Sequence, residues 1–449
     1  MTTDRTASPH AVGTPSIRPA HPTTRAALTA FATLLFFTLL AGEFWQNLIG
    51  WPAFIVLAGL LALGSIVWIA VLRPTVKFRK IPKSLMLFMA LATVSIAWSF
   101  YPGASALGLG AQWAATAGGV FLALCLSWSQ IIRTLGWALR LIVAGSLLFE
   151  LVVAIFVRHG VVPLVLPPFG DYSGKIPEAF YWSRGLLFHG SQIQGIQGNS
   201  NILAMTSLIA LIVFGVQLAN RSVRRSSGIT WLALAALTFV LTRSSTVIAA
   251  TVLTALVLAL TLWTRRRPPE KRGAVYGTAF GVIVVGVASV WLLWQPILNL
   301  LGKSDDLTGR GKIWEAVIGL AQQHPAFGWG WISYWAPWVE PFKGLAVRKG
   351  VTYLQAHNAW LDVWLQIGIV GLIIFIILVA STLGRSWFAA VDRPRTSIVD
   401  DQPFAATTLL PLLLITALIA QSAAESRILV EGGWALLVLI TMKTKADRP

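Results

Sequence analysis

The stretch AWLDVWLQIGIVGLIIFIILVAS, residues 359–381, decides the fold of this chain. It contains one charged side chain, Asp362, in a run of mostly large apolar residues. An α-helix needs about 20 predominantly apolar residues to cross a bilayer, so the stretch predicts a membrane-spanning helix.

Comparable apolar stretches recur along the whole chain. They lie near residues 26–46, 51–72, 84–100, 106–128, 135–157, 201–218, 229–242, 245–263, 275–296, 405–424 and 427–442. Apolar residues make up 56% of the 449 residues and charged residues 12%, whereas soluble domains carry about 25% charged residues. We therefore expect an all-α polytopic membrane protein with about twelve transmembrane helices.

Basic residues predict the orientation. With the N-terminus inside, the inner segments carry 24 of the 35 Lys and Arg residues. The positive-inside rule then places both termini in the cytoplasm and the two long loops, residues 158–200 and 297–357, outside. A single membrane domain, residues 26–443, would lie between a disordered cytoplasmic tail, 1–25, and a short cytoplasmic tail, 444–449.

The net charge of +18 favours the lipid bilayer as a partner. The basic residues of the chain are scattered over short loops between spans, where they attract anionic lipid headgroups. They form no patch that would bind nucleic acid. The single cysteine, Cys125, lies inside a predicted span, so the sequence predicts neither a disulfide framework nor a Cys-based metal site.

The two outer loops are the most informative segments about function, because they are neither apolar nor short. Prolines and glycines in loop 158–200 predict a folded lid. Loop 297–357 begins with a short amphipathic helix, which we expect to rest flat on the outer membrane surface. The apolar face of that helix consists of Ile313, Trp314, Val317, Ile318 and Ala321.

Arg310 stands at the start of this short helix, within Thr308-Gly309-Arg310-Gly311. Helix N-termini favour anions, and arginine pairs bidentately with phosphate, so the segment is a candidate cradle for a pyrophosphate. The alternative is an ordinary capped helix with an arginine that snorkels to the membrane surface.

His357 precedes the span at 359–381 and is one of only six histidines. No second histidine stands three or four residues away, and Asp362 is five away, so spacing gives neither a zinc pair nor a hydrogen-bonded dyad. The imidazole can act as a general base toward a sugar hydroxyl, or it can simply bond a loop carbonyl. We predict no metal and no cofactor.

Several motifs resemble the bacterial O-antigen ligase and O-antigen polymerase superfamily, which includes exopolysaccharide polymerases. They are Thr308-Gly309-Arg310 with Trp314, His324-Pro325-Ala326-Phe327-Gly328-Trp329-Gly330, His357-Asn358 with Gly368-Ile369-Val370-Gly371, Gly198-Asn199-Ser200-Asn201, and Glu425-Ser426-Arg427. The His-Asn pair, the nine-residue gap and Gly-x-x-Gly are the most specific part. The similarity covers about residues 195–435.

The resemblance implies a GT-C-like helical membrane protein that performs inverting, metal-independent glycosyl transfer. The donor would be a glycan on undecaprenyl diphosphate, and the acceptor a lipid, a wall-linked glycan or a growing chain. The site would face the outside of the bacterial cytoplasmic membrane, with His357 as the base. The implied substrate-binding residues are Arg310, Arg243, Arg184, Asn199, Asn201, Asn358, Trp314, Glu425 and Arg427.

One departure and three alternatives remain open. Family members often carry a basic residue just before a Thr after the seventh span, whereas Arg243 stands further upstream in Arg243-Ser244-Ser245-Thr246. Ligase and polymerase share the motifs. A lipid-phosphate-sugar glycosyltransferase would use Glu43 as its acidic base, and a transporter or flippase would place charges at mid-depth between repeated halves.

Overall fold

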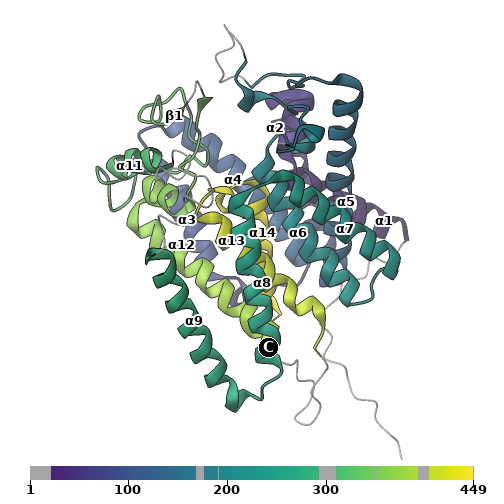
Figure 1. Cartoon of the computed structure of the whole chain (residues 1–449). Coiled ribbons are helices and arrows are strands. Elements are labelled where there is room, and N and C mark those ends of the chain that lie inside the picture. Colours follow the sequence, from purple (N-terminus) through teal and green to yellow (C-terminus); the bar gives the residue numbers. More distant parts are fainter. Residues whose placement is uncertain are drawn as a thin grey trace, which may run out of the picture.

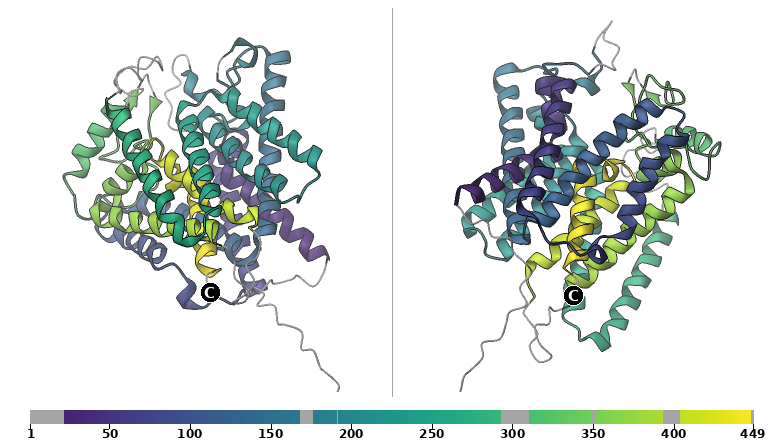
Figure 2. Two further views of the ribbon diagram at one scale, coloured as in Figure 1. Left: turned by 60° about the horizontal axis from the view of Figure 1, so that its bottom comes forward. Right: turned by 180° about the vertical axis from the view of Figure 1, so that it is seen from behind.

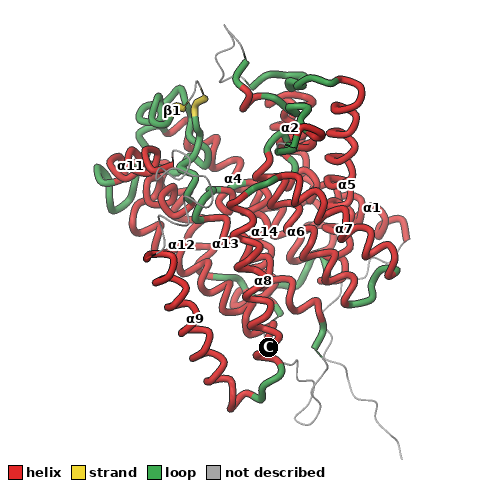
Figure 3. The backbone as a smooth tube through the Cα atoms, viewed as in Figure 1, coloured by secondary structure: helices red, strands yellow, loops and turns green. Residues whose placement is uncertain are grey.

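A computed structural model describes residues 22–167, 176–190, 192–292, 310–348, 351–392 and 404–447. The described chain is mostly helical (Figure 1, Figure 3), and a helix lies on each predicted apolar stretch. The helices are α1 Pro22–Leu40, α2 Gly42–Leu72, α3 Lys83–Val94, α4 Pro102–Cys125, α5 Trp128–Val152, α6 Ser200–Ala219, α7 Arg225–Thr242, α8 Ser245–Arg265, α9 Arg272–Leu292, α11 Arg310–Ala321, α12 Ala359–Val391, α13 Leu409–Ser422 and α14 Glu431–Ala446.

Eight helices of the described chain are long and apolar enough to cross a membrane. They are α1, α2, α4, α5 with the π-turn that extends it to Val157, α6, α7, α8 and α12. Lys83–Trp98 and Ala406–Ser422 are shorter apolar helices. The expectation of a mostly helical, multi-pass membrane protein is confirmed, whereas the count of twelve spans and the side of each terminus remain predictions.

Helix α6 lies at the centre of the bundle, and 72% of the residues in its apolar stretch are buried inside the protein. It packs against α5, α7 and α13, and α14 packs against α4. Figure 2 shows the same bundle from two further directions. Small residues permit these close contacts, because a Cβ at Gly119 of α4 would stand 2.8 Å from the carbonyl oxygen of Ala435.

A kink divides α12 at Ile367 and Gly368. Gly368 has a φ of +68°, which L side chains rarely adopt, and a Cβ there would stand 2.1 Å from the carbonyl oxygen of Ala326. The kink leaves backbone groups without a helical hydrogen-bond partner, and the loop that contains Pro325 supplies one. The amide of Ile369 donates to the carbonyl of Pro325 over 2.8 Å. The glycine of the motif therefore seats this loop against α12.

The short helix α11 corrects one expectation. Its residues Ile313 and Val317 pack with Trp335 and Phe342 of the following loop, and the helix contacts α12. Protein therefore covers the apolar face that we expected to rest on the membrane surface. The same loop forms a two-stranded antiparallel ribbon, β1 Val347–Arg348 and β2 Val351–Thr352, in which Val347 pairs with Thr352.

The described part of loop 158–200 is folded and tied to α5. The carboxylate of Glu150 accepts hydrogen bonds from the amides of Gln194 and Gly195, over 2.9 and 2.7 Å, and from the Ser183 hydroxyl over 2.8 Å. This buried carboxylate thus anchors the loop. Helix α11 and strand β1 lie at one end of the molecule, and the C-terminal end of α14 lies at the other (Figure 1).

Candidate active site

Glu425 is the centre of the candidate site. It lies in the turn between α13 and α14 and is 6% exposed. Its Oε1 accepts a hydrogen bond from Nη2 of Arg310 over 2.9 Å, and its Oε2 lies 2.7 Å from Nδ1 of His357. Asn201 and Gln355 donate weaker bonds from their amide groups, each over 3.4 Å. One carboxylate therefore joins three other segments of the chain to the turn between α13 and α14.

The backbone around His357 is held from three sides. The carbonyl of the preceding Ala356 accepts from Trp314 Nε1 over 3.0 Å, and the amide of Ala356 donates to Asp362 over 3.0 Å. His357 itself has a φ of +51°, and the Tyr353 ring stands at 75° to its imidazole, with the ring centroids 5.2 Å apart. These contacts fix the direction in which the imidazole points.

The two ring nitrogens of His357 have different surroundings. A carboxylate can only accept, so Nδ1 carries the hydrogen toward Glu425 in the neutral imidazole. Nε2 then holds the lone pair, and it forms no hydrogen bond with the part of the chain that the structure describes. This is the tautomer that a general base requires.

The N-terminal ends of several helices lie near His357 and Glu425, the pair called the dyad below. Asn199 caps α6 and Asn358 caps α12, each through its side-chain oxygen. Ser244 caps α8 and also donates to Oδ1 of Asn201 over 2.7 Å. Arg310 is the first residue of α11. Because the N-terminal ends of helices carry partial positive charge, this arrangement favours an anion beside Arg310.

The charges around Glu425 keep it ionised. Burial by itself would raise the pKa of this carboxyl, but the hydrogen bond and charge of His357, together with the charges of Arg310 and Arg427, hold its pKa below the usual range. Glu425 therefore acts as a permanent acceptor for its two partners.

Arg427 forms a second cluster beside the dyad. Its Nη1 donates to Glu431 over 2.8 Å and to the hydroxyl of Tyr334 over 3.0 Å, and its Nη2 bonds Glu43. The carboxylate that the alternative glycosyltransferase would use as its base is thus paired with an arginine. The cluster connects α2, α14 and the long loop next to Glu425.

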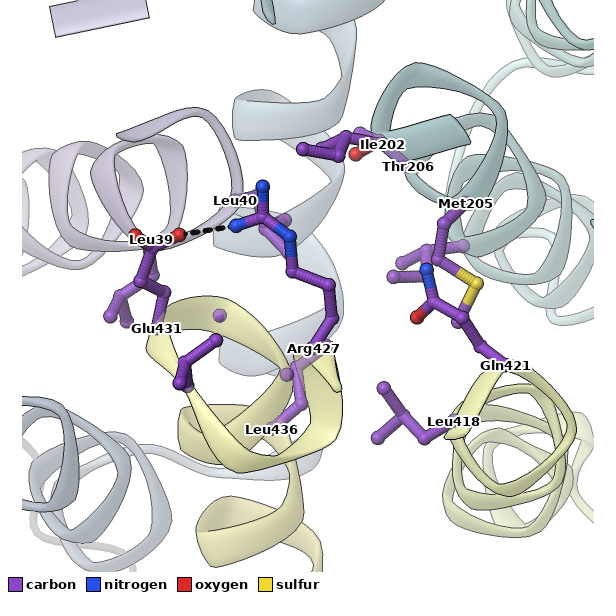
Figure 4. Close-up of a pocket in the computed structure, with 14 residues that line it drawn as sticks. Leu39, Leu40, Ile202, Met205, Thr206, Leu418, Gln421, Arg427, Glu431 and Leu436 are labelled. Carbon is purple, nitrogen blue, oxygen red and sulfur yellow. Dashed lines mark hydrogen bonds and ion pairs between the residues drawn. The ribbon is translucent and has the colours of Figure 1, made fainter. Parts of the chain in front are cut away.

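A pocket opens below the Arg427 cluster, between α1, α6, α13 and α14 (Figure 4). Arg427 and Glu431 stand at this pocket, and the amide of Gln421 faces into it (Figure 4). Its remaining walls are mostly apolar, with leucines from α1, α13 and α14. The pocket therefore combines apolar walls with polar groups that adjoin the site.

Two other predicted residues, Arg243 and Arg184, contact other groups. Arg243 ends α7 in a left-handed conformation, and its carbonyl accepts from Gln192 over 3.4 Å. Arg184 lies 3.8 Å from Glu178 within the first long loop. Neither arginine bonds Glu425 within the described residues, and Thr308 and Gly309 lie outside them.

Sequence reasoning missed the role of Glu425 as the partner of His357. Spacing along the chain points only to Asp362, because Glu425 lies 68 residues from His357. The sequence feature that indicates this role is the presence of a glutamate and an arginine close together between two apolar stretches, where charged side chains are energetically costly. The described residues contain no group of three or more His, Cys, Asp or Glu side chains that could hold a metal ion.

Comparisons with known proteins show what this chain is similar to. The O-antigen ligase family model matches residues 230–376, a range that includes Arg310 and His357. The chain is also 26% identical, over 330 residues, to the exopolysaccharide production protein ExoQ of Rhizobium meliloti strain 1021, covering 70% of this chain and 67% of ExoQ. The predicted resemblance to the O-antigen ligase-like family is confirmed.

Proposed function

We propose that this protein is a membrane glycosyltransferase that moves a glycan from a polyprenyl diphosphate, such as undecaprenyl diphosphate, to a sugar hydroxyl of an acceptor. The observation that carries the proposal is the shared carboxylate of Glu425, which holds a base, His357, next to a guanidinium, Arg310. A base and an anion site side by side are the two groups that such a transfer requires.

The reaction follows from these two groups. Nε2 of His357 takes the proton of the acceptor hydroxyl while that oxygen forms a bond to the anomeric carbon of the donor glycan. The bond from the anomeric carbon to the diphosphate oxygen breaks on the opposite face, and the diphosphate leaves with the electron pair. The configuration at the anomeric carbon is inverted, and the imidazolium later returns its proton to solvent.

Arg310 and the surrounding helix starts would hold the diphosphate. Its negative charge grows as the glycosidic bond breaks, so preorganised positive groups stabilise the transition state. A polyprenyl diphosphate is already a good leaving group. The transfer therefore needs positioning, charge neutralisation and proton removal, and we assign no metal or other cofactor to it.

We place the reaction on the outer face of the bacterial cytoplasmic membrane. The 24 basic residues of the inner segments, out of 35, favour an orientation in which the loop with Arg310 and His357 lies outside. The termini would be cytoplasmic. The acceptor is a lipid-linked or wall-linked glycan in a ligase, or a growing chain in a polymerase.

Reconstitution tests this function. Purified protein in liposomes, given a glycan on polyprenyl diphosphate and an acceptor glycan, should release polyprenyl diphosphate and form a new glycosidic bond. Movement of the lipid-linked glycan between leaflets without bond formation would instead identify a flippase. In cells, a deletion strain distinguishes the two activities. Loss of chain-length ladders would identify the protein as a polymerase, and accumulation of full-length lipid-linked polymer would identify it as a ligase.

A further inference from the structure

We propose that the diphosphate of the donor activates His357 by drawing Arg310 away from the carboxylate that the two residues share. This inference rests on the proposed function and adds a regulation of the same site. It starts from one geometric fact: Arg310 occupies Oε1 of Glu425 at 2.9 Å while His357 occupies Oε2 at 2.7 Å. A ligand that draws Arg310 away therefore leaves the charge of this carboxylate to His357.

Arg310 weakens the base as long as it stays on Glu425. A positive guanidinium near an imidazole disfavours the protonated imidazolium, and it also takes part of the negative charge that would stabilise that imidazolium. Both effects last as long as Arg310 stays on Glu425, and both end when it leaves.

A diphosphate reverses both effects. It offers Arg310 several charged oxygens with the geometry that a guanidinium prefers, so it competes directly with Glu425. Once Arg310 moves toward the diphosphate, Glu425 serves His357 alone, and the new negative charge lies nearby. The imidazole then gains proton affinity at the moment when the electrophile is in place.

The other groups that face His357 do not make this exchange. Asp362 is engaged by Ser426 and Trp335. Arg427 is engaged by its own cluster with Glu43, Glu431 and Tyr334. The Tyr353 ring stands at a steep angle to the imidazole and carries no charge, and Gln355 donates a hydrogen bond from its uncharged amide to Glu425. Among these neighbours, Arg310 is the cation that the proposed diphosphate would contact.

One consequence is an order of events. The donor must bind before the acceptor hydroxyl can be deprotonated efficiently, because the base reaches its full strength only in the donor complex. By the same linkage, protonation of His357 must favour binding of the diphosphate.

Calorimetry tests the coupling without turnover. Undecaprenyl diphosphate is titrated into the purified full-length protein in buffers of different ionisation enthalpy, so that the number of protons exchanged on binding is measured. We expect net proton uptake by the wild type near neutral pH. His357→Gln should bind the ligand without that uptake, and Arg310→Gln should bind it more weakly with reduced uptake. Lys312→Gln, which removes an exposed positive charge from the same helix, should retain both.

The pH dependence of turnover gives a second readout. The profile of kcat/KM for the donor reports the free enzyme, and that of kcat reports the donor complex. We expect the acidic limb of kcat to lie at higher pH than that of kcat/KM, and the two limbs to converge in Arg310→Gln. Binding without proton uptake, or coincident limbs in the wild type, overturns this inference alone. Failure to bind polyprenyl diphosphate at all overturns the proposed function and the inference with it.

Discussion

Nδ1 of His357 lies 2.7 Å from Oε2 of Glu425, although 68 residues separate the two in the chain. The contact gives the imidazole a fixed tautomer and a fixed direction, because the acceptor is a buried carboxylate that stays ionised. The pair therefore has the geometry that the proposed base and an orienting carboxylate would need.

Replacement of the base should remove turnover. His357→Ala and His357→Gln should lower kcat by roughly 10²–10⁴-fold, the usual contribution of a general base, while the protein still inserts into membranes and binds donor. His159→Gln, in the exposed part of the first long loop, is the matched control and should keep its activity. Near-normal transfer by purified His357→Ala would assign the base to another group.

Replacement of the orienting carboxylate should act through the histidine. Glu425→Gln can still form hydrogen bonds but no longer fixes the Nδ1–H tautomer or stabilises the imidazolium, so kcat should fall by about 10²–10⁴-fold. The acidic limb of its pH profile should also move to lower pH, which loss of packing alone would not produce. An unchanged limb would make Glu425 a structural residue.

Much of the fold follows from hydropathy. Each predicted apolar stretch carries a helix, because a bilayer accepts only segments that satisfy their own backbone hydrogen bonds. The boundaries were less accurate. Helix α1 begins at Pro22, and α14 continues to Ala446, within the segments expected to be cytoplasmic tails. Polar residues at helix ends can extend a helix without changing hydropathy, so the pattern does not mark where it stops.

The site could be predicted only in part. Arg310 and His357 stood out because each is a charged or titratable residue at the edge of an apolar stretch. The contact of both with Glu425 depends on how α11, α12 and α13 pack, which no local spacing encodes. The same limit explains α11, whose amphipathic pattern fits a membrane surface and a protein surface equally well. In the structure, the apolar face of α11 packs against Trp335 and α12, so protein covers it.

Replacement of the guanidinium should weaken donor binding. Arg310→Lys keeps a positive charge but loses the planar pair of donors, so the dissociation constant for polyprenyl diphosphate should rise roughly 10-fold or more. Binding by vesicle-reconstituted protein measures the effect, and Lys312→Gln is the control on the same helix. If Arg310→Ala bound the ligand as tightly as wild type, the diphosphate would lie elsewhere, with Arg243 and Arg184 as the next candidates.

The motif glycine at the kink of α12 should be sensitive to a single methyl group. Gly368→Ala would place a Cβ against the backbone of Ala326 and force an unfavourable φ, so it should destabilise the protein by roughly 1–3 kcal/mol. Gly384→Ala in the same helix meets no atom within 4 Å and should be neutral or slightly stabilising. Thermal unfolding of the purified proteins compares them, and equal stability would show that the kink relaxes.

The mechanism depends on the side of the membrane that carries His357. On the cytoplasmic side it would face the wrong leaflet for a flipped donor, whereas the basic residues predict that it lies outside. Single cysteines at Lys343, in the long loop, and at Ser226, at the start of α7, test this in a Cys125→Ala background, since both native side chains are exposed. With a permeabilised outer envelope, an impermeant thiol reagent should label Lys343→Cys and leave Ser226→Cys unlabelled. The reverse pattern would invert the topology and remove the case for a donor on polyprenyl diphosphate.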